Sequence, residues 1–139
     1  MVRYEMEKQL IGGTLAVKDV PAEWNRLYKE YLGVDVPYDT HGCLQDSHWS
    51  GGMLGYFPSY ALGSAYGAQM LRNMEQDVDV WGSVARGDLS QVTGWLTEKI
   101  HHYGRMLDPK ELVQQACGDF DPTVYTDYLT EKYSKLYNL

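Results

Sequence analysis

The sequence has few cysteines and few basic residues, and it contains no long apolar run. Its two cysteines, Cys43 and Cys117, form no CxxC pair, which argues against a disulfide scaffold, a zinc ribbon or a CxxC redox motif. No stretch of about 18 apolar residues occurs, so we expect no membrane partner. Twelve Lys and Arg against nineteen Asp and Glu give the 139 residues a net charge of −7. That balance argues against a nucleic-acid partner, because phosphate binding depends on clustered cations.

The first residues lack the apolar segment of a signal peptide, since charges begin at Arg3. Together with the low cysteine content, this predicts a reduced, cytoplasmic protein. The first helical pattern also begins without a capping residue, whereas a natural domain usually opens with a cap or a loose tail. We therefore expect that something upstream of Met1 has been removed.

Apolar residues recur mostly at helical spacing, which predicts about six or seven helices. These are expected near residues 2–10, 21–32, 58–76, 80–86, 92–103, 109–117 and 122–136. No segment alternates with a period of two over a useful length, which argues against strands. We expect an all-α bundle in a single segment, residues 1–139, with two helices in residues 1–33, one long glycine-rich loop over 34–57 and further helices over 58–139.

This loop and its flanks contain no basic residue between Lys29 and Arg72, a gap of 42 residues that holds seven of the fourteen glycines. A surface segment normally carries cations, so we expect this one to be buried or to line a cleft. Polar groups able to form hydrogen bonds lie among the glycines, namely Gln45, Asp46, His48, Tyr56 and Tyr60. This composition fits a functional site, and it fits a well-satisfied structural loop equally well.

The residue types in the loop suggest a division of roles. Asp46 can orient a histidine ring and so decide which nitrogen carries the proton. His48 can donate a hydrogen bond to a substrate carbonyl or act as an acid or base. The hydroxyl of Tyr56 can stabilise charge that develops on an oxygen in a transition state. These types alone do not identify a reaction.

The centre of the loop resembles a known family. Residues 42–49, GCLQDSHW, match every fixed position of GxxQDxHW, a motif of the carboxypeptidase Taq family of thermostable metallocarboxypeptidases. The segments VRYEME from Val2, GYFPSY over 55–60 and YLTEKY over 128–133 also resemble that family. The resemblance covers essentially the whole chain.

The resemblance implies a zincin-like, all-helical, cytoplasmic enzyme, usually homodimeric, that removes single amino acids from peptide C-termini. Its zinc or cobalt ion is held by HExxH and a downstream Glu, and the Glu of the motif is the general base. This sequence has no HExxH, and His101 and His102 are adjacent, so they face different directions on a helix. We expect the C-terminal part of such a peptidase, with no cofactor of its own, inactive alone and partnered by an N-terminal catalytic part.

By the same resemblance, His48 and Tyr56 line the cleft wall opposite the metal, where they bind the peptide substrate and stabilise the tetrahedral oxyanion. Gln45, Asp46 and Trp49 are expected to shape and support the loop. Tyr60 is either a cleft residue or a helix-packing tyrosine. The alternative for the whole chain is a stand-alone, non-catalytic helical binding or scaffold module derived from the family.

Overall fold

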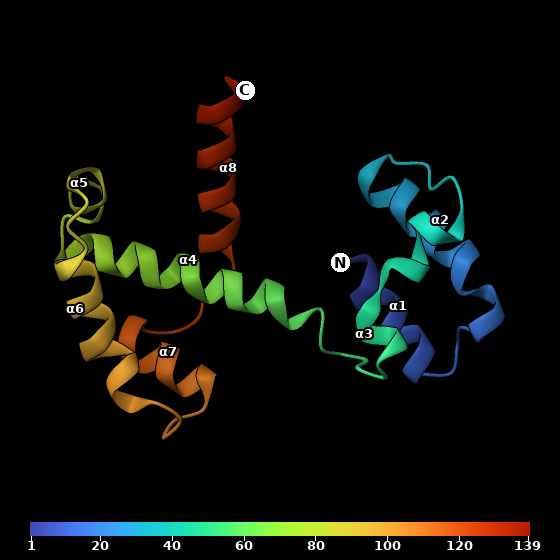
Figure 1. Ribbon diagram of the computed structural model, residues 1–139, viewed down its shortest axis with the longest axis horizontal. Helices are drawn as coiled ribbons and strands as arrows, with labels where there is room; N and C mark the ends of the chain where they lie inside the picture. Colours follow the sequence, from blue (N-terminus) through green and yellow to red (C-terminus); the bar gives the residue numbers. More distant parts are fainter. The chain divides into compact units, whose positions relative to one another are not determined.

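The computed structural model describes residues 1–139 and contains helices and loops but no strand (Figure 1). The α-helices are α1 (Val2–Ile11), α2 (Val20–Leu32), α3 (Ser47–Ser50), α4 (Ser59–Asp77), α5 (Val80–Arg86), α6 (Ser90–Lys99), α7 (Pro109–Cys117) and α8 (Thr123–Tyr137). Short 3-10 turns cover Val17–Asp19, Asp39–His41, Cys43–Gln45 and His101–Tyr103. The all-α prediction is confirmed. The expected loop over 34–57 contains α3 and two of the 3-10 turns. None of the helices combines the length and the apolar character that a membrane span requires.

Local capping signals set several of the helix ends. Pro21 lies in the first turn of α2, and Gly33 ends that helix with a φ of 68°, a left-handed conformation that glycine adopts without a Cβ clash. Helix α7 begins with a capping box in which the Asp108 side chain and the Glu111 side chain each accept from the other's backbone N–H. Because these interactions are local, the sequence predicted both helices closely.

The backbone contacts divide the chain into two compact units, Met1–Ala61 and Leu62–Leu139. The division falls in the first turn of α4. All of the expected site residues lie in the first unit, so this unit positions the candidate site.

The core of the first unit joins α1 to α2 and to the loop. Val2 and Met6 of α1 are buried against Trp24 and Leu27 of α2, together with Cys43 of the loop. The centroid of the Trp24 ring lies 4.8 Å from that of Tyr28, which stacks on it, and 5.8 Å from that of Trp49, which meets it edge-on. Apolar burial and aromatic contacts therefore anchor the loop on the two helices.

The second unit has its own core around Met74, Val80 and Trp95, from helices α4, α5 and α6 respectively. The Trp95 indole Nε1–H donates to Asp77 Oδ2 at 2.7 Å. Gln69 of α4 is buried and accepts from the Asp121 backbone N–H through its Oε1 at 3.0 Å. Buried polar groups in this unit are thus paired, as a stable helical packing requires.

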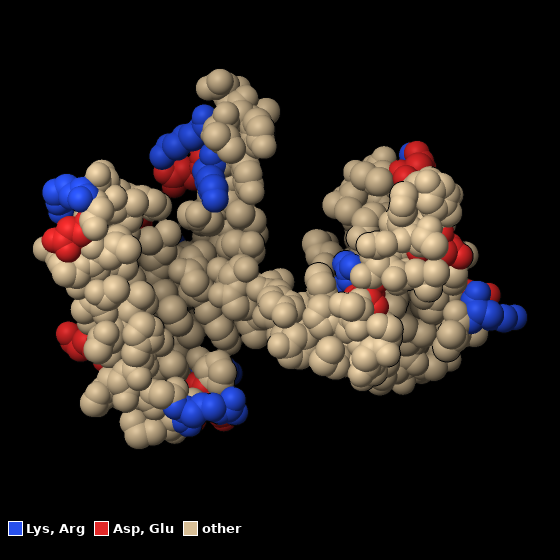
Figure 2. Space-filling model, in the orientation of Figure 1, with Lys and Arg blue, Asp and Glu red and all other residues tan.

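The surface carries its charges in small groups. On the face that Figure 2 shows, blue and red side chains lie next to one another in several places, separated by wide uncharged areas. The segment without basic residues is mostly exposed, which differs from the expected burial. Two stretches of it, residues 30–32 and 57–61, contribute to the lining of a hollow in the first unit.

Candidate functional site

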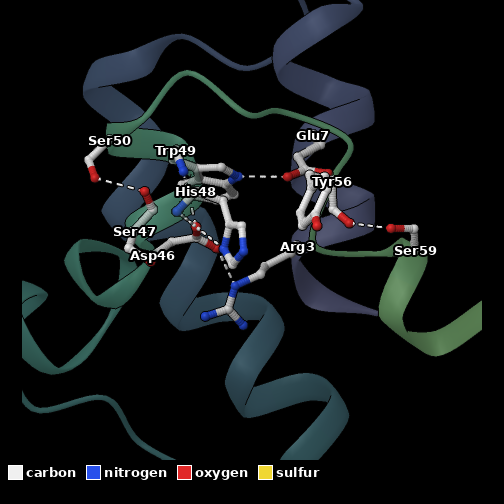
Figure 3. Close-up of polar contacts among 9 residues, drawn as sticks. All are labelled: Arg3, Glu7, Asp46, Ser47, His48, Trp49, Ser50, Tyr56 and Ser59. Atoms are coloured by element: carbon white, nitrogen blue, oxygen red, sulfur yellow. Dashed lines mark hydrogen bonds and ion pairs between the residues drawn. The ribbon is translucent and has the colours of Figure 1, made fainter. Parts of the chain in front are cut away.

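Asp46 caps the short helix α3 and so fixes the start of the QDSHW turn. Its Oδ1 accepts hydrogen bonds from the backbone N–H groups of His48 at 2.8 Å and Trp49 at 3.1 Å (Figure 3). These are donors that the first turn of a helix leaves unpaired. The cap holds the backbone of His48 and Trp49 in a defined turn.

Helix α1 holds the same turn through two side chains. Arg3 Nε donates to Asp46 Oδ2, and Glu7 Oε1 accepts from the Trp49 indole Nε1–H at 2.7 Å. Arg3 and Glu7 are four residues apart, which places them on one face of α1, and Figure 3 shows both directed at the turn. Neither residue was predicted as a site residue. Their i, i+4 spacing within the VRYEME match was the signal that could have identified them.

The Asp46 carboxylate is fully buried. Burial acts to raise the pKa of this carboxyl, but hydrogen bonds from the Trp49 amide, the Arg3 guanidinium and the His48 amide outweigh it and lower the pKa. Arg3 is itself largely buried, with 19% of its side chain exposed. The site therefore contains a paired, ionised carboxylate at neutral pH.

Aromatic rings surround His48, which is half-buried. The Tyr56 ring stacks on the imidazole with centroids 5.5 Å apart, and Phe57 and Tyr60 meet it edge-on at 5.0 and 6.1 Å. A hydrogen bond with Tyr56 raises the pKa of Tyr60. Tyr56 and Tyr60 are 52% and 57% exposed. The structure thus brings His48, Tyr56 and Tyr60 into one cluster whose tyrosines are accessible to a ligand.

Gln45 and Trp49 make contacts within the loop and its support. The Gln45 side-chain amide donates to the Thr40 backbone carbonyl, and Gln45 is otherwise exposed. Trp49 is held by Glu7 and packs on Trp24. These contacts are those of residues that shape a loop, which is the role we expect for both.

A hollow of about 620 Å³ adjoins the aromatic cluster and shares Phe57 and Tyr60 with it. The remaining lining residues come from the N-terminus and α1, from α2, and from Pro58 and the first turn of α4: Met1, Val2, Arg3, Tyr4, Tyr28, Glu30, Tyr31, Leu32, Pro58 and Ala61. The lining is mostly apolar and rich in tyrosine, which suits a ligand that is mainly apolar and carries a few hydrogen-bonding groups.

The donor groups of this chain do not fit a metal site. A zinc ion takes three or four protein ligands, and no group of three His, Cys, Asp or Glu side chains is placed to hold one. Asp46 is already bound to Arg3 and to the amides of α3, and His101 and His102 are exposed. We derive no chemistry from a metal held by these residues.

The glycine that opens the motif is required by close packing. A Cβ on Gly42 would lie 2.8 Å from Val36 Cγ1 and 3.4 Å from Trp24 Cδ1. We expect Gly42→Ala to lower the free energy of unfolding by about 1–3 kcal/mol through overpacking, measured by urea unfolding. Gly51→Ala is the control, because its Cβ would meet atoms only at ordinary contact distances of 3.4–3.5 Å. Equal stability of the two variants would contradict this explanation.

Comparison with known proteins agrees with the motif. Residues 1–133 match the family described as carboxypeptidase Taq (M32) metallopeptidase. The chain belongs to this family. It is 41% identical to carboxypeptidase 1 of Bacillus subtilis over an alignment of 141 positions, which covers 100% of the chain and 28% of that protein.

Solved structures of M32 carboxypeptidases share the fold. The M32 carboxypeptidase from Deinococcus radiodurans superposes with a TM-score of 0.93 at 35% identity, covering 99% of this chain and 28% of that one. Metallocarboxypeptidase 1 of Trypanosoma cruzi gives a TM-score of 0.90 at 39% identity, covering 95% of this chain and 28% of that one. The chain therefore spans about 28% of the length of these M32 relatives, and the resemblance seen in the sequence is confirmed at the level of the family.

Proposed function

We propose that this M32 chain forms the substrate-binding wall of a metal-dependent carboxypeptidase that releases single amino acids from peptide C-termini. The metal ligands and the general base would come from residues outside this sequence. The observation that carries the proposal is the cluster of His48 with Tyr56, placed by a complete GxxQDxHW motif beside an apolar hollow. Family membership and the carboxypeptidase names of its relatives support it.

In this proposal, His48 and Tyr56 bind the peptide and stabilise the oxyanion. Peptide hydrolysis places negative charge on the former carbonyl oxygen, and a preformed donor aimed at that oxygen lowers the barrier. The exposed hydroxyl of Tyr56 and the imidazole of His48 are donors of this kind. Tyr60 and the hollow would contact the substrate side chain, while Gln45, Asp46 and Trp49 hold the turn.

A chimera tests the proposal, with the 139 residues substituted for the matching segment of Bacillus subtilis carboxypeptidase 1. We expect the chimera to release C-terminal amino acids from short peptides. Tyr56→Phe should lower its kcat by about 100- to 1,000-fold with little change in folding, because one oxyanion donor is lost. Tyr133→Phe, which changes a tyrosine of α8 outside the first unit, is the matched control. A kcat for Tyr56→Phe equal to that of the control would rule out this role.

The isolated chain gives a complementary test. It should bind no stoichiometric zinc and release no amino acids from peptides, because the water-activating groups are absent. Metal analysis after dialysis and an amino-acid release assay measure both properties. Tight stoichiometric zinc together with turnover would contradict the proposal, and a chimera that folds but never turns over would favour a non-catalytic binding module. We also propose a cytoplasmic homo-oligomer, which fractionation and light scattering of the assembled enzyme would check.

A further inference from the structure

One ring nitrogen of His48 is buried without a hydrogen bond. His48 Nδ1 has no hydrogen-bond partner in the structure, although an imidazole nitrogen buried in this way normally has one. The charged oxygen paired with it is Oδ1 of Asp46, at 3.4 Å. A proton on Nδ1 would face this carboxylate favourably, whereas a lone pair there would face it unfavourably.

The carboxylate that faces Nδ1 is held in place by Arg3 as well as by two backbone amides. Oδ1 of Asp46 already accepts from two backbone amides, and Oδ2 is bound by Arg3 Nε. Arg3 is the one cation paired with this fully buried side chain. Without this counter-ion the buried carboxylate would lose part of what holds its charge and its position opposite His48.

Arg3 is held in place by aromatic rings as well as by Asp46. Its Cζ lies 4.2 Å from the ring centroid of Phe57 and 4.9 Å from that of Trp24. Cations over aromatic faces at these distances are attracted to the ring. Since Phe57 also contacts His48 edge-on, Arg3 and His48 are fixed against the same ring.

We infer that Arg3 is a positioning residue for His48, acting through Asp46. By helping to hold the charge and the position of Asp46, Arg3 keeps the proton of neutral His48 on Nδ1 and leaves the lone pair on Nε2. Its functional meaning depends on the proposed function: in the cleft wall, Nε2 would accept a hydrogen bond when His48 is neutral and donate one when His48 is charged. The charged and titratable groups recorded around His48 are Asp46, Tyr56 and Tyr60, with Arg3 behind Asp46.

Nitrogen NMR of the full 139-residue chain tests this inference without any substrate. Long-range proton–nitrogen correlation spectra distinguish a protonated from an unprotonated ring nitrogen, and His48→Gln assigns the His48 signals. At a pH where His48 is neutral, the Nδ1–H tautomer should dominate in the unaltered chain. Arg3→Met, which keeps an unbranched side chain but removes the guanidinium, should reduce that preference.

Further variants separate this effect from loss of folding. Arg3→Gln removes the charge but keeps the stem to Cδ and an N–H donor in the place of Nε, so it decides the outcome if Arg3→Met does not fold. Arg3→Lys should recover the Nδ1–H tautomer through its charge. Arg26→Met is the control, because it removes an arginine of the same unit whose partners are Glu23 and Glu30, away from Asp46.

Three results would overturn the inference. They are an Nε2–H tautomer in the unaltered chain, an unchanged Nδ1–H preference in folded Arg3 variants, and an equal change in Arg26→Met. A reduced preference in the Arg3→Met and Arg3→Gln chains, with its recovery in Arg3→Lys, would establish it. An inactive chimera would leave these spectra unaffected, so failure of the proposed function is distinguishable from failure of this inference.

Discussion

Replacing Asp46 with alanine is expected to lower the free energy of unfolding by about 3–5 kcal/mol at neutral pH, because a buried ion pair would lose one partner. The Arg3 side chain, of which 19% is exposed in the native pair, would then be a largely buried charge without its partner. Two amides of α3 would also lose their acceptor. Urea unfolding followed by circular dichroism measures the change.

The control for this substitution is Asp35→Ala. Asp35 pairs with Lys29, but its side chain is 83% exposed, and exposed pairs contribute about 0–1 kcal/mol. Equal losses at Asp35 and Asp46 would contradict the central role of the buried pair.

The effect of Asp46→Ala should also depend on pH. Asp46 has a lowered pKa in the folded chain, so its stabilisation is fully present above the unfolded value of about 3.9 and is lost as the pH falls through the lower folded value. The difference in free energy of unfolding between the unaltered chain and Asp46→Ala should therefore shrink in acid below about pH 4. A difference that stays constant down to strongly acidic pH would show that the Asp46 charge contributes nothing.

Trp24→Ala should lower the free energy of unfolding by about 3–5 kcal/mol, as expected for a large aromatic side chain removed from a core. Trp24 is 2% exposed and is the residue through which α1, α2 and the loop meet. Its removal would take away the stacking with Tyr28, the edge contact with Trp49 and the ring beneath Arg3. Thermal unfolding followed by circular dichroism measures the loss.

Trp81→Ala makes the same chemical change at a surface position. Trp81 is 58% exposed and makes a hydrogen bond to Glu75 at 2.5 Å, so its replacement should change stability by no more than about 1 kcal/mol. If Trp24→Ala and Trp81→Ala unfolded at the same temperature, burial at Trp24 would not be the source of its effect.

Local patterns determined the helices well. The spacing of apolar residues, Pro21 with Gly33, and the Asp108 capping box predicted helices that the structure contains, because each of these signals acts within a few residues along the chain. The short helix α3 was not predicted. Four residues leave no periodicity to detect, and the helix depends on one side-chain cap from Asp46.

The motif likewise identified the segment that contains His48, whereas the contacts around this segment are set by the tertiary structure. GxxQDxHW indicated the family, and the resemblance predicted that His48 and Tyr56 line the same wall of the cleft. Nothing along the chain connects position 3 with position 46, or position 7 with position 49. Such pairs, 43 and 42 residues apart, form only when α1 packs on α2 and the loop closes over both.

The sequence by itself determined the helical class, the family and the loop in which the candidate site lies, since these follow from local spacing and from a motif of adjacent residues. Only the tertiary structure decided that Arg3 and Glu7 hold that turn, that Gly42 lies against Val36, and that the segment without basic residues is mostly exposed. The physical reason is that burial and the pairing of a buried carboxylate are properties of contacts between distant segments.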